Sequence, residues 1–388
     1  MEIRNTALGI LSSRLGGRPF YVRFQVTRRC NYRCGMCGQD HDRGDELAGK
    51  DMEAVASRLA ALGARHLVLT GGEPFLRSDL PEIIAVFRAR GFSIRVQTNG
   101  GPQVTEDVLA RCVGAGLRDV SVSIDTLDRG LQDDICRARG VRDNALRTLS
   151  MARRLLPDSL SLANVVASSY NFDELPTLVR RFHSMGVYTY ITPVMIAAEA
   201  GGEDGGYRFR AQGGAEFAVR RGRDVRSVHV VDELIALRRT GHGLTNSTRH
   251  LRDYRKYLET GVCTWQCEAG VLGLDVFPDG GVGICKEKPA FGNILDSGFV
   301  EAYAGGSFGE QNRSTATACS GCFYGEYREP QYAIRSSRVV AEWAVDYART
   351  FRHGMRFNPR AERAVEGSPL SVVREAPPPS AERAVRDE

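Results

Sequence analysis

Between about residues 20 and 195, short apolar runs alternate with longer stretches in which apolar residues recur at helical spacing. The short runs are rich in valine, isoleucine and threonine, a composition typical of β-strands. The longer stretches have the period of amphipathic helices. We expect strands at residues 21–27, 66–70, 92–98, 119–125, 161–168 and 187–194.

Helical stretches separate these predicted strands. A regular alternation of strand and helix predicts βαβ units, in which the strands run parallel and helices cover the sheet. Six such units close only part of a barrel, so the α/β fold that we expect first is an open (βα)6 barrel, and second a doubly wound sheet. The predicted helices cover residues 51–64, 80–91, 105–116, 144–156 and 172–186.

Polar or glycine-rich segments follow the first four predicted strands. They comprise a loop with three cysteines after the first strand, and then Thr70–Pro74, Gln97–Gly100 and Ser123–Asp128. In both candidate folds, ligands bind at the carboxyl ends of the parallel strands. We therefore expect these four segments to form one site.

The second half of the chain has a different pattern. It begins with a glycine-rich stretch, typical of a loop or linker, and continues with helical and cysteine-bearing segments. It ends in a tail with almost no apolar residues to bury, which we expect to be disordered. The domains that we expect are a barrel at 1–200, a glycine-rich loop and helical linker at 201–260, a cysteine-bearing module at 261–330, a helix at 331–354 and a disordered tail at 355–388.

Charge and hydropathy narrow the environment of the protein. The 388 residues carry a formal net charge of +5, and the arginines are scattered among acidic residues rather than gathered in a stripe. This distribution fits solvated helix faces, so we expect no nucleic-acid partner. The chain has no long apolar run, and its first twenty residues lack the features of a secretion signal, so we expect a cytoplasmic protein without a membrane partner.

Ten cysteines are present, and their grouping indicates metal chemistry because thiols in the cytosol stay reduced. Cys30, Cys34 and Cys37, here called the cysteine triad, have the spacing C-x3-C-x2-C, which lets three thiolates converge on one inorganic centre. Three protein ligands leave one position open, as on an iron-sulfur cubane with one exchangeable iron. A zinc ion completed by a distant fourth residue is the alternative.

The cysteine triad after the first strand, followed by Gly71-Gly72-Glu73-Pro74 after the second, resembles the radical S-adenosylmethionine (radical SAM) enzymes, which have a partial (βα)6 barrel. The resemblance covers residues 20 to about 195. It implies a [4Fe-4S] cluster on the triad, with SAM bound to the open iron. It also implies a reductant such as flavodoxin or ferredoxin, whose electron cleaves SAM to a 5'-deoxyadenosyl radical that removes hydrogen from the substrate.

The same resemblance implies a set of SAM-binding residues at the strand ends. The glycine-rich segment matches the part of the family that meets the SAM amino group, and polar residues after the third and fourth strands match positions near the ribose or the methionine. Each polar residue could also be an ordinary turn or cap residue. The implied contacts are Gly71, Gly72, Glu73, Pro74, Thr98, Asn99, Ser123 and Asp125.

One position departs from the pattern of the family. The residue before the third cysteine is often aromatic in radical SAM enzymes, and here it is Met36. A flexible thioether can still cover an adenine ring. The change weakens only an expectation of aromatic stacking.

A second group of cysteines lies in the C-terminal half. Cys267 and Cys285 flank a Pro-Asp-Gly-Gly turn, which predicts a β-hairpin, and Cys319 and Cys322 add two thiols. By itself this set also fits a structural zinc ribbon. It is similar to the twitch module of some radical SAM enzymes, a shortened form of SPASM. That similarity implies a small α+β cluster-binding module, with one auxiliary [4Fe-4S] cluster on these four residues.

Three cysteines remain. Cys112 lies on the apolar face of a predicted helix and is expected in the core. Cys263 could replace one auxiliary ligand, lie near the cluster as a free thiol, or be packed. Cys136, in the connection after the fourth strand, is a weak catalytic candidate that could donate a hydrogen atom to a substrate radical.

An auxiliary cluster that accepts an electron from a substrate radical favours an oxidoreductase or lyase. We expect hydrogen abstraction from a small polar metabolite, such as a sugar, aminocyclitol or nucleoside, in a redox or elimination step of natural-product biosynthesis. The first alternative is a maturase of a ribosomally made peptide, and the second is a non-catalytic metal-binding scaffold.

Overall fold

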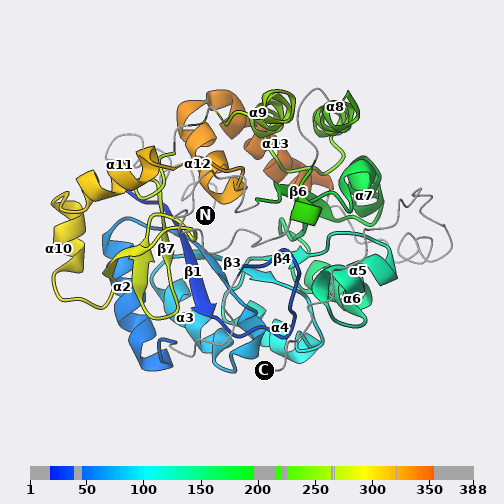
Figure 1. The fold of residues 1–388 in the computed structure, drawn as a ribbon. Helices are drawn as coiled ribbons and strands as arrows, with labels where there is room; N and C mark the ends of the chain where they lie inside the picture. The colour runs from blue at the N-terminus through cyan, green and yellow to red at the C-terminus, as the bar shows by residue number, and fades with distance from the viewer. Residues whose placement is uncertain are drawn as a thin grey trace, which may run out of the picture.

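The computed structural model describes residues 18–38, 46–195, 215–219, 225–263, 265, 267–319 and 321–353. A single sheet runs through this part of the chain (Figure 1). Its parallel strands confirm the six predicted ones: β1 (Tyr21–Thr27), β2 (His66–Gly71), β3 (Ser93–Thr98), β4 (Asp119–Ser123), β5 (Leu162–Ala167) and β6 (Tyr188–Pro193). The sheet does not close, and its parallel strands follow in chain order from β1 to β6 without the reversal of order that defines a doubly wound sheet, so the partial barrel is confirmed.

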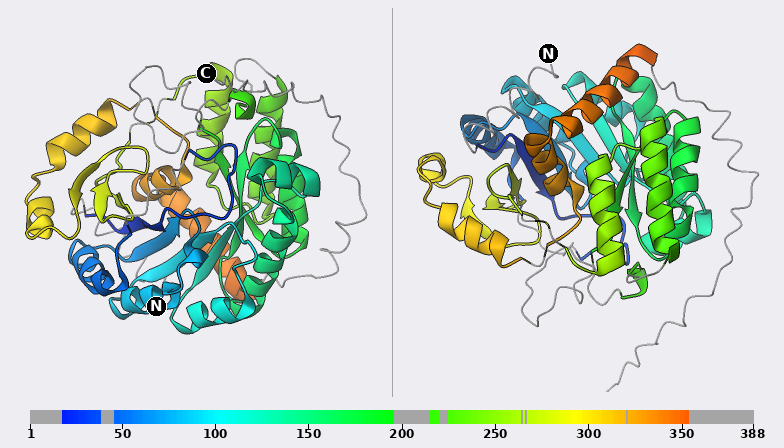
Figure 2. Two further views of the ribbon diagram at one scale, coloured as in Figure 1. Left: turned by 60° about the horizontal axis from the view of Figure 1, so that its bottom comes forward. Right: turned by 90° about the horizontal axis from the view of Figure 1, so that it is seen from above.

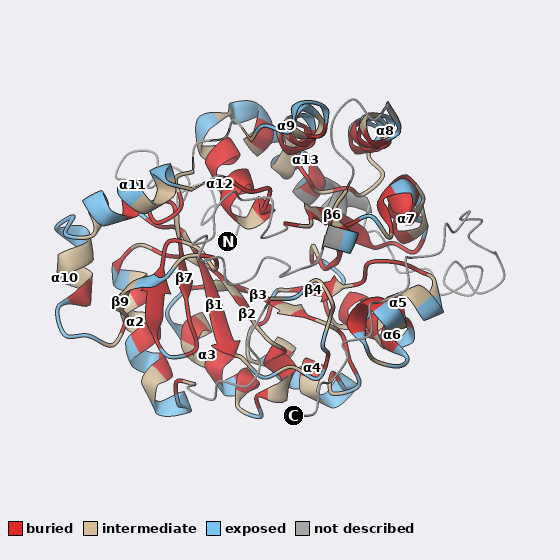
Figure 3. Cartoon of the chain, viewed as in Figure 1, coloured by how far each residue is buried: buried red, intermediate tan, exposed pale blue. Residues whose placement is uncertain are grey.

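Alternation along each strand decides which side chains face the helices. On β1, Val22, Phe24 and Val26 are at most 1% exposed and belong to the hydrophobic core, whereas Arg23 and Gln25 face the barrel interior. Figure 3 shows that the strands at the centre of the sheet are largely buried. Because successive side chains of a strand point to opposite faces, the apolar residues hold the helices and the polar ones line the interior.

Helices cover the outer face of the sheet (Figures 1 and 2). Five of them occupy the predicted stretches, and α5 lies in a connection where no helix is expected. Those of the first half are α2 (Met52–Ala61), α3 (Leu80–Ala89), α4 (Glu106–Gly114), α5 (Arg129–Cys136), α6 (Val141–Leu155) and α7 (Leu175–Ser184), with short 3-10 turns η1 (Gly49–Asp51), η2 (Pro74–Leu76) and η3 (Phe172–Glu174).

The cysteine-bearing half joins the same sheet. The expected hairpin is present, because β7 pairs antiparallel with β8, and β7 also pairs parallel with β1, which the sequence pattern did not indicate. The sheet order is β6-β5-β4-β3-β2-β1-β7-β8-β9. The remaining elements are η5 (Ala215–Phe217), α8 (Val225–Thr240), α9 (Thr248–Thr260), β7 (Gly273–Val276), β8 (Gly281–Gly283), β9 (Ala290–Asn293), α10 (Phe299–Ala304), α11 (Gly309–Thr317), α12 (Gly325–Arg335) and α13 (Ser337–His353).

Helix α12 connects the two sides of the open barrel. On one side, a Cβ atom on Gly325 would collide with the Tyr190 hydroxyl of β6, so the helix packs directly on that strand. On the other, the Tyr327 hydroxyl donates to Asp275 of β7 at 2.9 Å and accepts from Arg23 of β1 at 3.1 Å. The helix therefore forms the wall of the interior where the strands leave a gap.

No helix in the described ranges is long and apolar enough to cross a membrane. The domain boundaries given above remain predictions. The N-terminal residues, most of the glycine-rich stretch and the tail at 355–388 lie outside the described residues.

Candidate functional site

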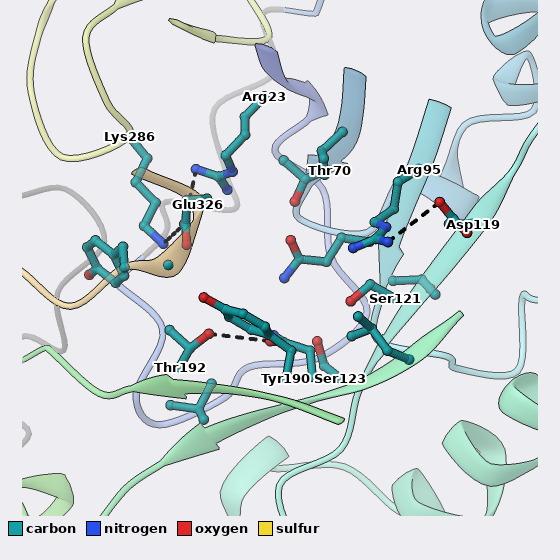
Figure 4. A pocket seen from close by; sticks show the side chains of 18 of the residues that line it. Arg23, Thr70, Arg95, Asp119, Ser121, Ser123, Tyr190, Thr192, Lys286 and Glu326 are labelled. Atoms are coloured by element: carbon teal, nitrogen blue, oxygen red, sulfur yellow. Dashed lines mark hydrogen bonds and ion pairs between the residues drawn. The ribbon is translucent and has the colours of Figure 1, made fainter. Parts of the chain in front are cut away.

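A cavity of about 720 Å³ occupies the barrel interior. It reaches from the cysteine triad, at the carboxyl ends of the strands, to Arg23 and Lys286, and α12 and α13 contribute to its wall. The inward side chains are largely polar, whereas closed (βα)8 barrels fill this space with bulky apolar residues. Figure 4 shows Arg23, Thr70, Arg95, Ser121, Ser123 and Tyr190 directed into this space.

The loop that carries the cysteine triad is held by backbone hydrogen bonds from two sides. Gly72 and Glu73 of the β2 loop donate to the carbonyl oxygens of Thr27 and Arg29 at 2.9 and 2.8 Å. From the other side, the carbonyl oxygen of Ile135 at the end of α5 accepts from the Gly35 amide at 2.9 Å. The unexpected helix α5 therefore positions the cysteine loop.

The three thiols of the triad line the cavity and differ in their surroundings. Cys37 is exposed, while burial raises the pKa of Cys30 to about 11. A hydrogen bond with Cys136, together with burial, raises the pKa of Cys34 well above its usual range. In the described part of the chain, no three His, Cys, Asp or Glu side chains come close enough to hold a single metal ion. The triad remains the predicted cluster site.

Gly71 and Gly72 are required by the close packing of two loops. A Cβ atom on Gly71 would collide with the Thr27 carbonyl oxygen, and one on Gly72 with that of Arg29. Both glycines line the cavity, but their missing side chains make room for the cysteine loop. Overpacking at such a contact distorts the backbone, so these glycines bring the second loop close to the triad.

Glu73 and Pro74 are not among the residues that line the cavity. Glu73 is completely buried, and its carboxylate accepts hydrogen bonds from the amides of Phe75 and Asn99 at 3.0 and 2.7 Å and from the Thr98 hydroxyl at 2.8 Å. Burial raises its pKa to about 7, although these hydrogen bonds favour the ionised form. Pro74 is buried at the start of η2. Glu73 thus ties the ends of β2 and β3 together.

Thr98 and Asn99 line the cavity at the end of β3. The Thr98 hydroxyl donates to the Glu73 carboxylate and accepts from the Gly100 amide, so it has a structural role. The Asn99 side-chain amide lies 3.7 Å from the Cys30 sulfur and donates to Asn31 at 2.8 Å. Asn99 is therefore the one of the pair that reaches the cysteine loop.

Ser123 and Asp125 also line the cavity. The Asp125 carboxylate accepts from the Val166 amide at 2.8 Å, and burial raises its pKa to about 7. Gln132 was not singled out in the sequence. Its carbonyl accepts from the Asp125 amide at 2.8 Å, and its amino group donates to the Cys136 sulfur at 3.3 Å. Gln132 links the end of β4 to the thiols.

Charged residues that the sequence interpretation missed lie at the other end of the cavity (Figure 4). Glu326 pairs with Lys286 at 3.0 Å and with Arg23 at 3.6 Å. Burial opposes ionisation of Glu326, but the two cations outweigh it and lower its pKa to about 2. Asp275 accepts from Arg23 at 2.9 Å, yet burial raises its pKa to about 6.

Several polar groups in the cavity wall have no hydrogen-bond partner among the described residues. They include both amide atoms of Gln25, a side chain only 2% exposed, and the Tyr190 hydroxyl, together with the Tyr32 hydroxyl and His66 Nε2. Buried polar groups without partners are costly. Their positions on the wall indicate that a ligand completes them. Polar residues at alternate positions of an otherwise apolar strand were the signal for Arg23 and Gln25.

The C-terminal cysteines lie at the base of α12. Cys285 follows the hairpin, and Cys322 is buried in the turn before the helix. Cys263 joins them, because its sulfur accepts a hydrogen bond from Arg328 at 2.9 Å. Cys112 is fully buried in the core, as expected. Cys136 lies against Cys34, and its suggested role as a hydrogen-atom donor remains a prediction.

Comparison with known families identifies the first half of the chain. The model of the radical SAM superfamily matches residues 24–182, which hold the end of β1, strands β2 to β5, the cysteine triad and the glycine-rich loop. These residues form a radical SAM domain. Its cofactors are a [4Fe-4S] cluster and SAM, and the soft thiol donors beside a polar cavity fit that pair.

Curated relatives match less than half of this chain. A probable GTP 3',8-cyclase of Methanopyrus kandleri is 37% identical over 170 residues, 42% of this chain and 53% of that protein. A GTP 3',8-cyclase of Xanthomonas campestris is 33% identical over 183 residues, 44% of this chain and 53% of that protein. The chain thus spans about half the length of the curated relatives it matches.

Solved structures share the fold over most of the chain. Streptococcus suis SuiB bound to S-adenosylmethionine matches with a TM-score of 0.57 at 12% identity, over 80% of this chain and 72% of that one. The enzyme anSMEcpe with bound AdoMet matches with a TM-score of 0.56 at 14% identity, over 90% of this chain and 99% of that one. At this identity they show the fold alone.

The relatives correct the expected function. A redox or elimination step on a small metabolite of natural-product biosynthesis, with its maturase and scaffold alternatives, is wrong, because the curated relatives are named for the cyclisation of GTP. The expected radical SAM chemistry is supported, whereas the assignment to the oxidoreductases or lyases remains a prediction. None of these comparisons names a twitch or SPASM module, so the auxiliary cluster remains a prediction.

Proposed function

We propose that this chain is a radical SAM enzyme that cyclises a purine nucleoside triphosphate, with GTP as the first candidate. The observation that carries the proposal is one cavity that joins the cysteine triad to two cationic side chains, Arg23 and Lys286. The similarity to GTP 3',8-cyclases supports the choice of nucleotide. The reductant, such as flavodoxin or ferredoxin, remains an expectation.

The triad end of the cavity would hold the cofactors. The cluster and SAM, once reduced by one electron, supply a 5'-deoxyadenosyl radical that abstracts a hydrogen atom. The triad would ligate the cluster, while the loop of Gly71 and Gly72 and the side chain of Asn99 border the space for SAM. Asp125, with a pKa raised to about 7 by burial, can hold or release a proton near neutral pH.

The other end of the cavity would hold the substrate. Within the described residues, Arg23 contacts Asp275, Glu326 and Tyr327 through Nη1 alone, which leaves Nε and Nη2 as donors for an anion. Lys286 adds a second cation, and guanidinium and ammonium groups together are suited to phosphate oxygens. Gln25 and Tyr190, between the two ends, offer donors and acceptors to a base or a ribose.

The test is an anaerobic assay of the reconstituted full chain with SAM, dithionite and GTP deuterated at C3', since the name of the relatives marks C3' and C8 as the joined atoms. We expect deuterium in 5'-deoxyadenosine and a product isomeric with GTP. A Cys37→Ala chain should give neither. SAM cleavage that GTP does not stimulate, with no deuterium transfer, would contradict the proposal.

A further inference from the structure

Arg328 is a buried cation at the base of α12, with only 1% of its surface exposed. Its Nε donates to the Cys322 carbonyl oxygen at 2.6 Å, and its Nη2 donates to the Cys263 sulfur at 2.9 Å. Nη1 donates to the Tyr332 hydroxyl at 3.0 Å, and the guanidinium carbon lies 3.7 Å from the ring centre of Phe323. The side chain is fixed by contacts on every nitrogen.

The charge of Arg328 is poorly balanced by carboxylates. Its ion pair is with Asp253 at 3.9 Å, a side chain that is 26% exposed and is bridged to Arg328 by the Tyr332 hydroxyl. His250, also buried nearby, has its pKa lowered to about 3 by burial and by Arg328, so it is neutral and adds no counter-charge. A buried cation needs compensating negative charge close by. The cysteine thiols beside Arg328 are the groups on which that negative charge can form.

The thiol of Cys263 and the backbone of Cys322 meet this cation at short range. Cys263 Sγ lies 2.5 Å from where a Cβ of Gly321 would be, so this sulfur packs inside the turn between Cys319 and Cys322. Gly321 has a φ of +87°, a conformation that suits glycine and keeps the turn open to the sulfur. Arg328 thus holds the turn by two hydrogen bonds, one to the Cys322 carbonyl oxygen and one to the Cys263 sulfur.

We propose that Arg328 is a positioning residue that fixes the Cys319–Cys322 turn and raises the reduction potential of the auxiliary cluster, with Cys263 as its hydrogen-bonded neighbour rather than a ligand. The proposal rests on the expected auxiliary [4Fe-4S] cluster. Adding one electron to a thiolate-bound cluster increases its negative charge, and a nearby guanidinium stabilises that reduced form. Net charge and hydrogen bonds to sulfur are known to set cluster potentials.

The experiment isolates the auxiliary cluster in a full chain whose triad is replaced by Cys30→Ala, Cys34→Ala and Cys37→Ala. In this parent we compare Arg328→Gln and Arg328→Lys by iron content and by redox titration followed by electron paramagnetic resonance. At a fixed solution potential, the Gln variant should show a reduced-to-oxidised ratio about tenfold lower, a shift of about 59 mV for one electron. The Lys variant should stay within about threefold of the parent, because its charge remains.

Two further full-chain variants serve as controls. Arg153→Gln removes another buried arginine, one that donates to the Ser159 and Pro157 carbonyl oxygens, and should leave the potential unchanged. Cys263→Ala should keep the iron content of the parent. Loss of iron in that variant would overturn the assignment of Cys263.

An unchanged reduction potential in Arg328→Gln would overturn the proposal that the charge of Arg328 raises the potential of the auxiliary cluster. If the Gln variant binds no iron, Arg328→Lys decides, since a tenfold shift despite the retained charge would overturn the proposal. A parent without iron would overturn it together with the auxiliary cluster. SAM cleavage by the wild-type chain would remain open to its own test, because that reaction depends on the triad.

Discussion

At the scale of the residue, the absence of a side chain at Gly72 is what lets the two site loops touch. We expect Gly72→Ala to lower the free energy of unfolding by about 1–3 kcal/mol, the usual cost of overpacking, because the new Cβ would collide with the Arg29 carbonyl oxygen. Gly114→Ala is the matched control. Gly114 ends α4 with no atom within 4 Å of its would-be Cβ, so stability there should be unchanged or slightly higher. Urea denaturation checks both, and equal losses would contradict the interpretation.

Glu73 gives the fold a pH dependence of its own. Its pKa is raised by burial from 4.5 to about 7, so the folded chain binds the proton more tightly than the unfolded chain does. This contribution to stability is therefore present below about pH 4.5 and lost as the pH rises through 7. We expect Glu73→Gln to flatten the fall of unfolding free energy across this window. Parallel curves for wild type and variant would show that Glu73 does not titrate there.

Lys286 tests the substrate end of the cavity. We expect Lys286→Met to raise the KM for GTP about tenfold, the loss of one charge-assisted hydrogen bond, with a smaller change in kcat. Glu326 keeps Arg23 as its partner in this variant. Lys288→Met is the control, because Lys288 does not line the cavity. A KM that does not respond to Lys286→Met would place the phosphates elsewhere.

The sequence was informative at the triad and the glycine-rich loop because both depend on local spacing. It did not reveal Arg23, Gln25 and Lys286 as site residues. Arginine is abundant in this chain, and most arginines are solvated, so composition did not reveal that Arg23 and Arg95 face inward. Only the alternation of side chains along β1 shows which residues face inward, because the residues between its apolar positions point to the opposite face.

At the scale of the element, α12 stands in for the strands that would close the barrel. Tyr327 makes the key contacts, since its hydroxyl meets Asp275, Arg23 and the Lys286 amide within 3.1 Å. We expect Tyr327→Phe to lower the unfolding free energy by about 1–3 kcal/mol, because a buried carboxylate loses its donor. Tyr32→Phe is the control, as the Tyr32 hydroxyl has no hydrogen-bond partner among the described residues. Denaturant titration should separate the two, and equal stability would contradict the bridging role.

The predicted strands agree closely with the observed ones because their alternation of apolar and polar residues is strong. Helix α5 was missed since its sequence, RGLQDDIC, is only eight residues long and has few apolar residues. Its role comes from its C-terminal end, where the carbonyl oxygens of Ile135 and Cys136 accept hydrogen bonds from the cysteine loop. Contacts made by backbone groups do not produce a periodic pattern of apolar residues in the sequence.

At the scale of the whole molecule, the cysteine-bearing half is part of the barrel sheet. Pairing of β7 with β1 joins segments about 250 residues apart, which no local pattern can indicate. We expect a chain ending at Gly261 to expose an edge of β1 and to aggregate, while a chain ending at His353 stays monodisperse. Size-exclusion chromatography distinguishes them. A monodisperse short chain would show that the first half folds alone.

The position of α12 also limits how such proteins can be recombined. This helix begins just after the last cysteine of the C-terminal group, yet its side chains face the same cavity as the triad. A hybrid that joined this radical SAM domain to the C-terminal half of a relative would exchange one wall of the cavity along with the predicted auxiliary cluster site. Substrate choice and electron delivery would then be inherited together, as a single module.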